Sequence, residues 1–450
     1  MPPSTRRRVL HALGTGFAVG AAGCATTGTT STTTRTTAET TTSEPTETTE
    51  TTDEPANFAS EDWRVESLNG PVQAFFLPNR PPTPETLGGP LYTVTESGQI
   101  ARIAVADGTV EWTVDLTGVQ PDTDSFVTTG EHCFPVSDTR NQETLRNYVD
   151  AVNLATGERQ WTFEAREFLT ALGVVDGMLY LAGHYIKAPP SEIGPERSAK
   201  GEGRLHAVDI ATGEEQWSST LPALRGATVA DHGLYATAWP EEASELRLHA
   251  FDLDGTERWV VGTGAETPHV PAVVEEGVLA GTASGFGLYA SGDGDVRWRV
   301  QKWQSGAREI VVLDDGTIAA GWHPVVTVSQ DGTVTHRLAD RGMVVLPATP
   351  STLYVVTGSS IIAGDRRSGG SRWRYDPEDA KYTHIQAIIR EWVAVDKGVG
   401  RSQELLFLDE ESGAVGGRLT APGDYHDVVG LGEKLFVGTD AGVYAYVVNA

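Results

Sequence analysis

Two histidines are the side chains whose spacing comes nearest to a metal site. His206 and His249 each stand third in an Arg-Leu-His-Ala segment, and the two segments have similar surroundings. Imidazole is a common zinc ligand, but a zinc site needs three or four ligands, and no second ligand lies at a useful spacing from either histidine. We therefore interpret both histidines as occupants of one position in a repeat.

Four aspartates near glycine turns suggest a calcium loop in the same way: Asp252, Asp254, Asp293 and Asp295. A calcium loop continues into a full series of oxygen ligands that includes a bidentate glutamate, and none of these segments does. Aspartate also accepts hydrogen bonds from nearby backbone amides in turns. The pattern favours turn capping over metal binding.

No other segment carries a chemical signature. The sequence lacks the Gly-x-x-x-x-Gly-Lys-Ser/Thr, Gly-x-Ser-x-Gly and His-Glu-x-x-His motifs of phosphate loops, hydrolases and zinc proteases. Of the two cysteines, Cys133 lies in the apolar run His-Cys-Phe-Pro-Val-Ser, which predicts a buried structural thiol. We assign no catalytic, cofactor-binding or metal-binding residue.

A repeated unit runs through most of the chain. Positions 151–161 read AVNLATGERQW and positions 207–217 read AVDIATGEEQW. A glycine followed four residues later by tryptophan occurs after apolar, alternating runs at Gly108/Trp112, Gly157/Trp161, Gly213/Trp217, Gly255/Trp259, Gly294/Trp298 and Gly369/Trp373. Two further units keep the glycine and lose the tryptophan, with His336 after Gly332 and Gly417 after Gly413. Such self-similarity indicates a repeat fold.

Each unit predicts four strands, because short alternating runs rich in Val, Leu, Tyr and Trp are bounded by Gly and Asp. Four strands per roughly 40 residues are typical of a β-propeller blade. We expect an all-β propeller of eight blades, with nine, the strict count of units, as the alternative. The last unit has three strands, and the segment around Trp63 can supply the fourth, so we expect the N- and C-terminal strands to close the ring.

The glycine and the tryptophan of each unit have structural roles. Glycine supplies the positive φ of a tight hairpin between the third and fourth strands. The tryptophan that follows would fill the wedge between neighbouring blades, where a large ring buries on the order of 200 Å². We interpret these tryptophans as core residues rather than as a ligand-stacking site.

On these residues the chain resembles the quinoprotein-type β-propeller family, whose blades carry a PQQ-like repeat with a tryptophan-docking motif of this form. The resemblance spans residues 63 to 450. The family includes pyrroloquinoline-quinone dehydrogenases and non-catalytic relatives such as the lipoprotein of the bacterial outer-membrane β-barrel assembly machine. Alcohol-oxidising members hold the quinone against a vicinal disulfide, with a calcium ion. This chain has no adjacent cysteine pair, so it resembles the non-catalytic branch.

The first 61 residues form a different class of sequence. Residues 5–10 match a twin-arginine export signal and residues 21–24 (AAGC) resemble a lipobox, so we expect a signal over 1–24 and lipidation of Cys24. Simple cleavage and an uncleaved anchor are the alternatives. From 26 to 52, 17 of 27 residues are Thr, which predicts a disordered tether over 25–61, before a propeller over 62–450.

The charge of the chain is strongly negative. The formal net charge is −27, and residues 63–450 carry 30 basic against 53 acidic side chains. An acidic surface with six lysines in the whole chain indicates a protein of haloarchaeal type, because concentrated salt screens self-repulsion. An ordinary acidic extracellular protein is the alternative. Nucleic acid is excluded as a partner, since phosphate binding needs clustered positive charge.

Three insertions separate the second and third strands of consecutive units, at 138–147, 184–203 and 239–245. Loops at this place in neighbouring blades emerge on one face, and loops on a rigid scaffold commonly carry function. We therefore predict a partner-binding face that contains His184, Tyr185, Lys187 and Trp239. Tolerated surface insertion is the alternative.

The sequence favours an exported, membrane-anchored, monomeric propeller at the cell surface, acting as a non-catalytic binding or scaffold module for protein partners. We expect no cofactor. The alternative is a pyrroloquinoline-quinone-dependent dehydrogenase of alcohols or sugars, which would use the quinone with calcium.

Overall fold

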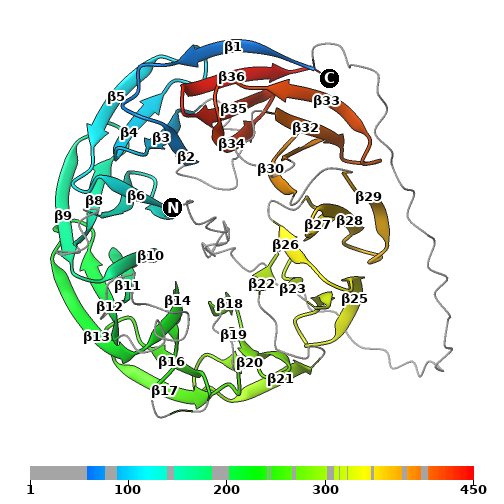
Figure 1. The fold of residues 1–450 in the computed structure, drawn as a ribbon. Helices are drawn as coiled ribbons and strands as arrows, with labels where there is room; N and C mark the ends of the chain where they lie inside the picture. Colours follow the sequence, from blue (N-terminus) through cyan, green and yellow to red (C-terminus); the bar gives the residue numbers. More distant parts are fainter. Residues whose placement is uncertain are drawn as a thin grey trace, which may run out of the picture.

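The computed structural model describes residues 58–76, 89–138, 146–184, 202–240, 243, 245–265, 270–301, 309–313, 315–321, 323–345, 349–377, 383–396 and 404–449. In these residues 36 strands form nine antiparallel sheets of four strands each, and there is no helix. Figure 1 shows the sheets as blades around a common axis. The predicted all-β propeller of four-stranded blades is confirmed.

Eight blades use four consecutive strands each. Blade 1 contains β2 (Val72–Phe76), β3 (Leu91–Thr95), β4 (Gln99–Ile103) and β5 (Val110–Asp115), and blade 2 contains β6 (Gln120–Thr128), β7 (His132–Asp138), β8 (Asn147–Asn153) and β9 (Arg159–Ala165). Blade 3 contains β10 (Phe168–Val175), β11 (Met178–His184), β12 (Glu202–Asp209) and β13 (Glu215–Pro222), and blade 4 contains β14 (Leu224–Ala230), β15 (Gly233–Ala238), β16 (Arg247–Phe251) and β17 (Glu257–Gly262). Blade 5 contains β18 (Ala272–Val274), β19 (Gly277–Thr282), β20 (Gly285–Ala290) and β21 (Val296–Gln301), and blade 6 contains β22 (Glu309–Val312), β23 (Ile318–Gly321), β24 (Val325–Val328) and β25 (Val334–Ala339). Blade 7 contains β26 (Met343–Val345), β27 (Thr352–Thr357), β28 (Ser360–Asp365) and β29 (Ser371–Tyr375), and blade 8 contains β30 (His384–Ile389), β31 (Trp392–Asp396), β32 (Glu404–Asp409) and β33 (Val415–Thr420).

Blade 9 combines the two ends of the folded region. Its inner three strands are β34 (Tyr425–Leu431), β35 (Lys434–Thr439) and β36 (Gly442–Val448), and its outer strand is β1 (Ala59–Val65). β1 runs antiparallel to β36, with Ala59 opposite Val448 and Val65 opposite Val443. The strand thus begins a few residues before position 62.

The expectation of eight blades is wrong, because the structure has nine. Eight was preferred because two units lack the tryptophan, but each of them still forms a complete blade. His336 takes the ring position over Gly369, and the ring of Phe58 lies against Gly417. The blade count follows the strands and the turn glycine rather than the tryptophan.

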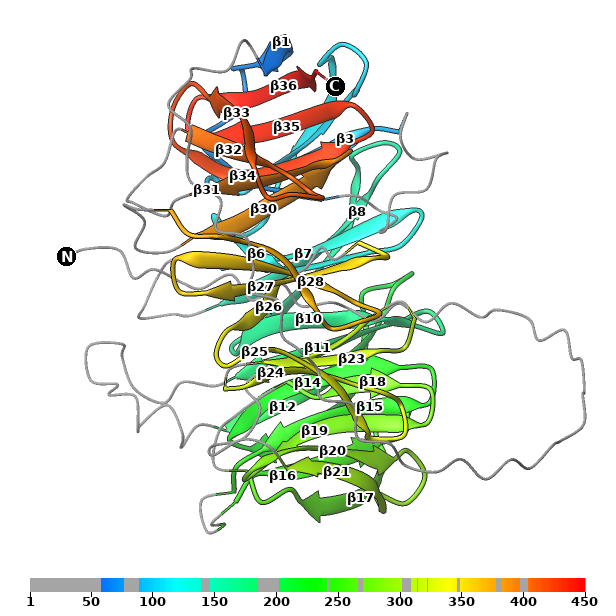
Figure 2. The ribbon, with the colours of Figure 1, turned by 90° about the vertical axis from the view of Figure 1, so that its right-hand side faces the viewer.

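The strands of a blade run from the axis to the rim. The first strand of each blade lies innermost and the fourth outermost (Figure 1). Because neighbouring strands are antiparallel, the loops between second and third strands and the linkers between blades share one face of the ring, and the glycine turns share the other. Figure 2 shows the ring from its side.

The apolar core is divided among the blade interfaces. The described residues form nine clusters of buried side chains, and each cluster draws on two neighbouring blades. Between blades 9 and 1, for example, Trp63 and Phe436 pack with Val72 and Leu91. A four-stranded blade cannot bury both faces alone, so each blade depends on its neighbours.

An aromatic ring of one blade lies over the turn glycine of the next. A Cβ built on Gly213 would lie 2.7 Å from Cδ2 of Trp161 in the preceding blade. The φ of Gly213 is 76°, in the region that favours glycine. The backbone conformation and the close contact with the Trp161 ring therefore both require glycine at this position. The same contact joins Trp63 to Gly108, Trp112 to Gly157, Trp217 to Gly255, Trp259 to Gly294, Trp298 to Gly332, His336 to Gly369 and Trp373 to Gly413.

Most of these indoles are also fixed by a hydrogen bond to the turn that they cover. Trp161 Nε1 donates to the carbonyl of Ile210 at 2.8 Å. Equivalent bonds to turn carbonyls are made by Trp63, Trp217, Trp259, Trp298 and Trp373. The ring is thereby held in one orientation over the glycine.

Trp112 is the exception among the docked indoles. Its Nε1 is buried and has no hydrogen-bond partner. The Leu154 carbonyl, which stands where Ile210 stands in the next blade, accepts from the Tyr92 hydroxyl and from Arg102 instead, each at 3.0 Å.

This difference predicts unequal effects of the same substitution. Trp161→Phe removes a hydrogen bond, whereas Trp112→Phe removes an N–H that has no partner. We expect Trp161→Phe to lower the free energy of unfolding by about 1 kcal/mol more than Trp112→Phe does. Urea denaturation of both variants measures the difference. Equal losses of unfolding free energy in the two variants would show that the hydrogen bond from the indole to the turn does not stabilise the fold.

Candidate functional site

The predicted partner-binding face begins at the ends of two second strands. His184 is the last residue of β11, and Trp239 directly follows β15. The three insertions do connect second to third strands in blades 2, 3 and 4. Tyr185 and Lys187 lie outside the described residues.

His184 and Trp239 meet on one segment, the start of β14. The Trp239 backbone N–H donates to the Ala223 carbonyl at 3.0 Å, and the His184 ring bonds to the backbone of Leu224. Leu224 also packs against Gly203, the residue opposite His184 in the sheet. We call His184, Ala223, Leu224, Arg225 and Trp239 the blade 3–4 corner.

The Trp239 side chain is held by its own loop. It is half-buried, and its indole N–H donates to the Ala243 carbonyl at 3.0 Å. Because both its backbone and its side-chain N–H groups are bonded, little rotational freedom would be lost if a partner packed against the ring.

The electrostatics of the corner keep His184 neutral. Burial lowers the pKa of His184 below its ordinary value, the bond to the Leu224 backbone partly opposes this, and the positive charge of Arg225 adds to the lowering. Burial also lowers the pKa of the Arg225 guanidinium. At neutral pH the corner therefore presents a neutral imidazole beside one cation.

Sequence reasoning missed Ala223, Leu224 and Arg225. Ala223 has a φ of 49°, a left-handed conformation that costs an alanine on the order of 1 kcal/mol. Other linkers between blades use glycine for this geometry, as at Gly264 and Gly423. No local pattern marks the segment, because its role depends on contacts with β11 and β15.

The two histidines at one repeat position do not come together. His206 Nδ1 lies 2.6 Å from Glu215 Oε1, and His249 Nδ1 lies 2.7 Å from Glu257 Oε1, each within its own blade. Across the part of the chain that the structure describes, no three His, Cys, Asp or Glu side chains converge in a way that could hold a metal ion. Each histidine makes a carboxylate pair within a sheet.

The turn aspartates bond to their own turns. Asp254 Oδ1 accepts the Thr256 N–H at 2.9 Å and Asp293 Oδ1 accepts the Asp295 N–H at 3.0 Å, while Asp252 lies 3.2 Å from Arg258. The backbone contacts of Asp254 and Asp293 are those of turn capping, whereas Asp252 forms an ion pair with a side chain of β17.

Cys133 lies in the apolar cluster between blades 1 and 2. Cys133 is fully buried, and this burial raises the pKa of its thiol. Within the described ranges, no helix is long and apolar enough to span a membrane.

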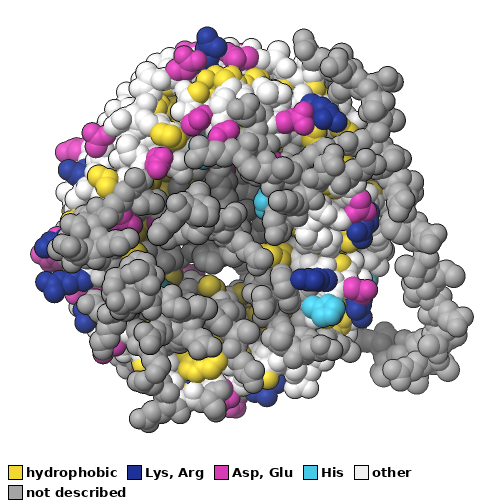
Figure 3. Space-filling view, viewed as in Figure 1, with side chains coloured by type: hydrophobic (Ala, Val, Ile, Leu, Met, Phe, Trp, Pro, Cys, Tyr) yellow, Lys and Arg dark blue, Asp and Glu magenta, His cyan; other side chains and the backbone are white. Residues whose placement is uncertain are grey.

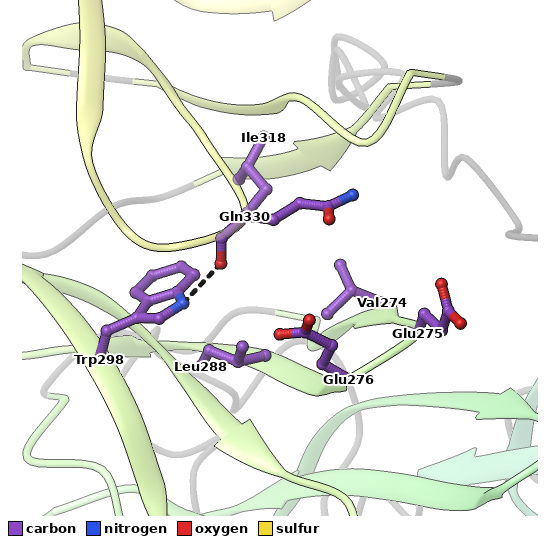
Figure 4. A pocket seen from close by; sticks show the side chains of 7 residues that line it. All are labelled: Val274, Glu275, Glu276, Leu288, Trp298, Ile318 and Gln330. Carbon is purple, nitrogen blue, oxygen red and sulfur yellow. Dashed lines mark hydrogen bonds between the residues drawn. The ribbon is translucent and has the colours of Figure 1, made fainter. Parts of the chain in front are cut away.

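A hollow at the interface of blades 5 and 6 is lined by Val274, Glu275, Glu276, Leu288, Trp298, Ile318 and Gln330 (Figure 4). Its volume of about 20 Å³ has room for one water molecule. Trp298 is docked there, with its Nε1 donating to the Gln330 carbonyl at 2.7 Å. The hollow is a gap beside a docked ring rather than a ligand cavity.

Charged side chains of both signs lie around the rim. On the face in Figure 3, Asp and Glu side chains stand beside Lys and Arg rather than in one patch of a single sign. Among the described residues, Arg102 forms an ion pair with Glu111, and Arg146 forms one with Glu164.

A protein-family model matches the middle of the chain. Residues 145–416 match the family described as outer membrane protein assembly factor BamB. This range covers more than half of the 450 residues. The chain belongs to this family. The expected resemblance to the PQQ-like β-propeller family is confirmed at the level of family and fold.

Solved structures match the chain at low sequence identity. BamB from Moraxella catarrhalis is 17% identical, with 74% of this chain and 97% of that chain covered and a TM-score of 0.46. The computationally designed Ika8 protein (10% identity, 86% and 99% covered) and Sqt1 from Saccharomyces cerevisiae (9% identity, 86% and 98% covered) both have a TM-score of 0.49. No curated protein matches the chain.

The lowered pKa of His184 predicts a pH effect on stability. The unfolded chain binds a proton at His184 more readily than the folded chain does. The contribution of His184 to the free energy of unfolding is therefore fully present above about pH 6.5 and is lost as the pH falls below it. We expect His184→Asn to lose less stability than the parent protein between pH 7.5 and pH 5.5. Urea midpoints at the two pH values measure this, and the other histidines cancel in the comparison. An identical pH dependence in parent and variant would refute the assignment.

Proposed function

We propose that this chain is a non-catalytic binding module for a protein partner, and that the partner contacts the blade 3–4 corner. The observation that carries the proposal is the convergence of His184 and Trp239 on two adjacent residues, Ala223 and Leu224, where the linker from blade 3 enters β14. Both residues border the insertions, on the face that carries the connections from second to third strands.

The corner has the composition of a binding centre. Tryptophan and arginine are enriched among the residues that carry most of the energy of protein interfaces. Trp239 is held by two hydrogen bonds and Arg225 is partly desolvated. Membership of a family described as an assembly factor supports a binding role.

The proposal includes export and an anchor at Cys24. Phe58, the first described residue, lies at the face of the glycine turns, because β1 begins opposite the end of β36. The blade 3–4 corner lies on the opposite face. A lipid at Cys24 would therefore be joined to the folded domain at the face away from the corner.

The test is whether a variant of the blade 3–4 corner fails to capture one partner that the parent protein captures. Tagged protein carrying Trp239→Ser and Arg225→Gln is compared with the parent protein in capture from the native cell envelope at native salt. The partner is then purified and its affinity measured. Removal of a central tryptophan worth about 2 kcal/mol predicts a loss of affinity of roughly 30-fold.

A matched control removes an exposed apolar side chain elsewhere on the same face. Val119 lies in the linker between blades 1 and 2 and is 49% exposed. Val119→Ser is expected to keep the affinity of the parent protein. If the corner variant folds and binds within about two-fold of the parent, the corner is not the binding surface.

A further inference from the structure

The connection from β1 to β2 contains the one Asn-Gly pair of the sequence. Residues 66–71 lead from the outer strand of blade 9 to the inner strand of blade 1, and Asn69 and Gly70 lie near the end of this connection. Both residues are exposed. Gly70 has a φ of 88°, which favours glycine, and it has no side chain to shield its backbone nitrogen. The pair therefore places an exposed carboxamide next to an accessible peptide nitrogen.

The main chain of Asn69 is held against the hairpin between β3 and β4 of blade 1. Its N–H donates to Gln99 Oε1 at 3.1 Å, and its carbonyl accepts the Ser97 hydroxyl. A Cβ built on Gly70 would lie 3.5 Å from Ser97 Oγ, so the peptide that joins Asn69 to Gly70 lies beside this hydroxyl. The Asn69 backbone is thus bonded to blade 1.

The Ser97 hydroxyl favours loss of the proton from the Gly70 nitrogen. When a peptide nitrogen loses its proton, the negative charge is shared with the carbonyl oxygen of the same peptide, here that of Asn69. A hydrogen bond donated to an oxygen that gains negative charge becomes stronger and stabilises the charge. The contact from Ser97 to the Asn69 carbonyl therefore makes the Gly70 nitrogen a more available nucleophile.

Asn153 has the opposite arrangement. Its Oδ1 accepts two backbone N–H groups and a hydroxyl of its own turn. The nitrogen that follows it, that of Leu154, donates to the Glu131 carbonyl at 2.8 Å. Among the described residues, no such bond holds the Asn69 carboxamide or the Gly70 N–H. Asn153 is therefore a protected asparagine against which Asn69 can be compared.

We propose that Asn69 is a site of spontaneous deamidation through a cyclic imide, and that the product loosens the closure of the ring. Solvent hydroxide takes the proton of the Gly70 N–H, and the nitrogen attacks Asn69 Cγ. A new C–N bond forms, the Cγ–Nδ2 bond breaks, and the leaving group takes a proton from water and departs as ammonia. Water then opens the imide. Opening at the side-chain carbonyl gives aspartate, and opening at the main-chain carbonyl gives isoaspartate.

Isoaspartate changes the path of the chain next to the strand that closes the ring. Its main chain runs through Cβ and Cγ and is longer by one carbon, so the two bonds of the Asn69 backbone to blade 1 cannot both keep their geometry. We call the pairing of β1 with β36 the seam of the ring. Because residues 66–71 follow β1 directly, we expect the seam to open more readily in the isoaspartate form.

Peptide mapping of aged protein measures the modification. Full-length parent protein is incubated at native salt and mildly alkaline pH, and the Asn69 and Asn153 peptides are compared by mass spectrometry. We expect aspartate and isoaspartate to accumulate many-fold faster at Asn69, at a rate that rises with pH because hydroxide takes the proton. Asn69→Gln is the matched control, since its longer side chain disfavours closure of the imide, and it should stay unmodified. Equal rates at the two asparagines would overturn the proposal.

The part played by the Ser97 hydroxyl is tested by Ser97→Ala. We expect deamidation at Asn69 to slow several-fold in the folded variant and to match that of the parent protein in urea, where the contact is lost. A folded variant that reacts as fast as the parent, or faster, would refute the role of Ser97.

Hydrogen exchange of β1 tests the effect on the seam. The isoaspartate form is separated by ion exchange, and exchange in the peptide that contains Trp63 is followed over minutes to hours. We expect this peptide to exchange several-fold faster in the isoaspartate form than in the parent protein. Asn69→Asp carries the same charge on an unaltered main chain and should exchange like the parent. Equal exchange in all three forms would contradict the link between the modification and the seam.

Discussion

An aromatic ring lying against the backbone of a glycine in the next blade is the contact on which the rest of the ring depends. The missing Cβ lets the ring approach to a distance that no other residue permits, as at Trp161 over Gly213. The same glycine has the positive φ that the hairpin needs. One residue type therefore satisfies the turn within a blade and the packing between blades. This coupling explains how a short unit can be repeated with little else in common.

The contact varies in two places, and both variations have a structural reason. Between blades 6 and 7 an imidazole, His336, replaces the indole and still bonds the next turn through Nε2, 3.0 Å from the Arg367 carbonyl. Between blades 8 and 9 the glycine belongs to the earlier blade and the ring to the segment that begins the outer strand of the next blade. Blade 9 has no glycine turn before its outer strand, so a ring at position 417 would have nothing to cover. Phe58 supplies the ring instead, and Gly417 supplies the seat.

The repeat was predictable from sequence because each of its determinants is local. The glycine, the alternating strands and the tryptophan lie within about a dozen residues of one another, and they give the blade architecture directly. The number of blades was predicted wrongly because the lack of a tryptophan at positions 336 and 417 was taken as evidence against a ninth blade. That Phe58 fills the second gap could not be predicted, since the contact joins residues that are hundreds of positions apart. The corner shows the same limit, because His184 and Trp239 were marked by their insertions while Leu224 and Arg225 had no local signal.

The central claim is that the blades form one ring held by ring-on-glycine contacts, including the contact that crosses the seam. The most direct measurement compares the loss of unfolding free energy in Trp63→Ala, at the seam, with that in Trp217→Ala, inside the ring. Both indoles cover a turn glycine and bond a turn carbonyl. The account predicts losses of about 3 to 5 kcal/mol that are similar for both variants. A loss near zero in Trp63→Ala, beside a large loss in Trp217→Ala, would show that β1 is an appended strand and contradict the claim.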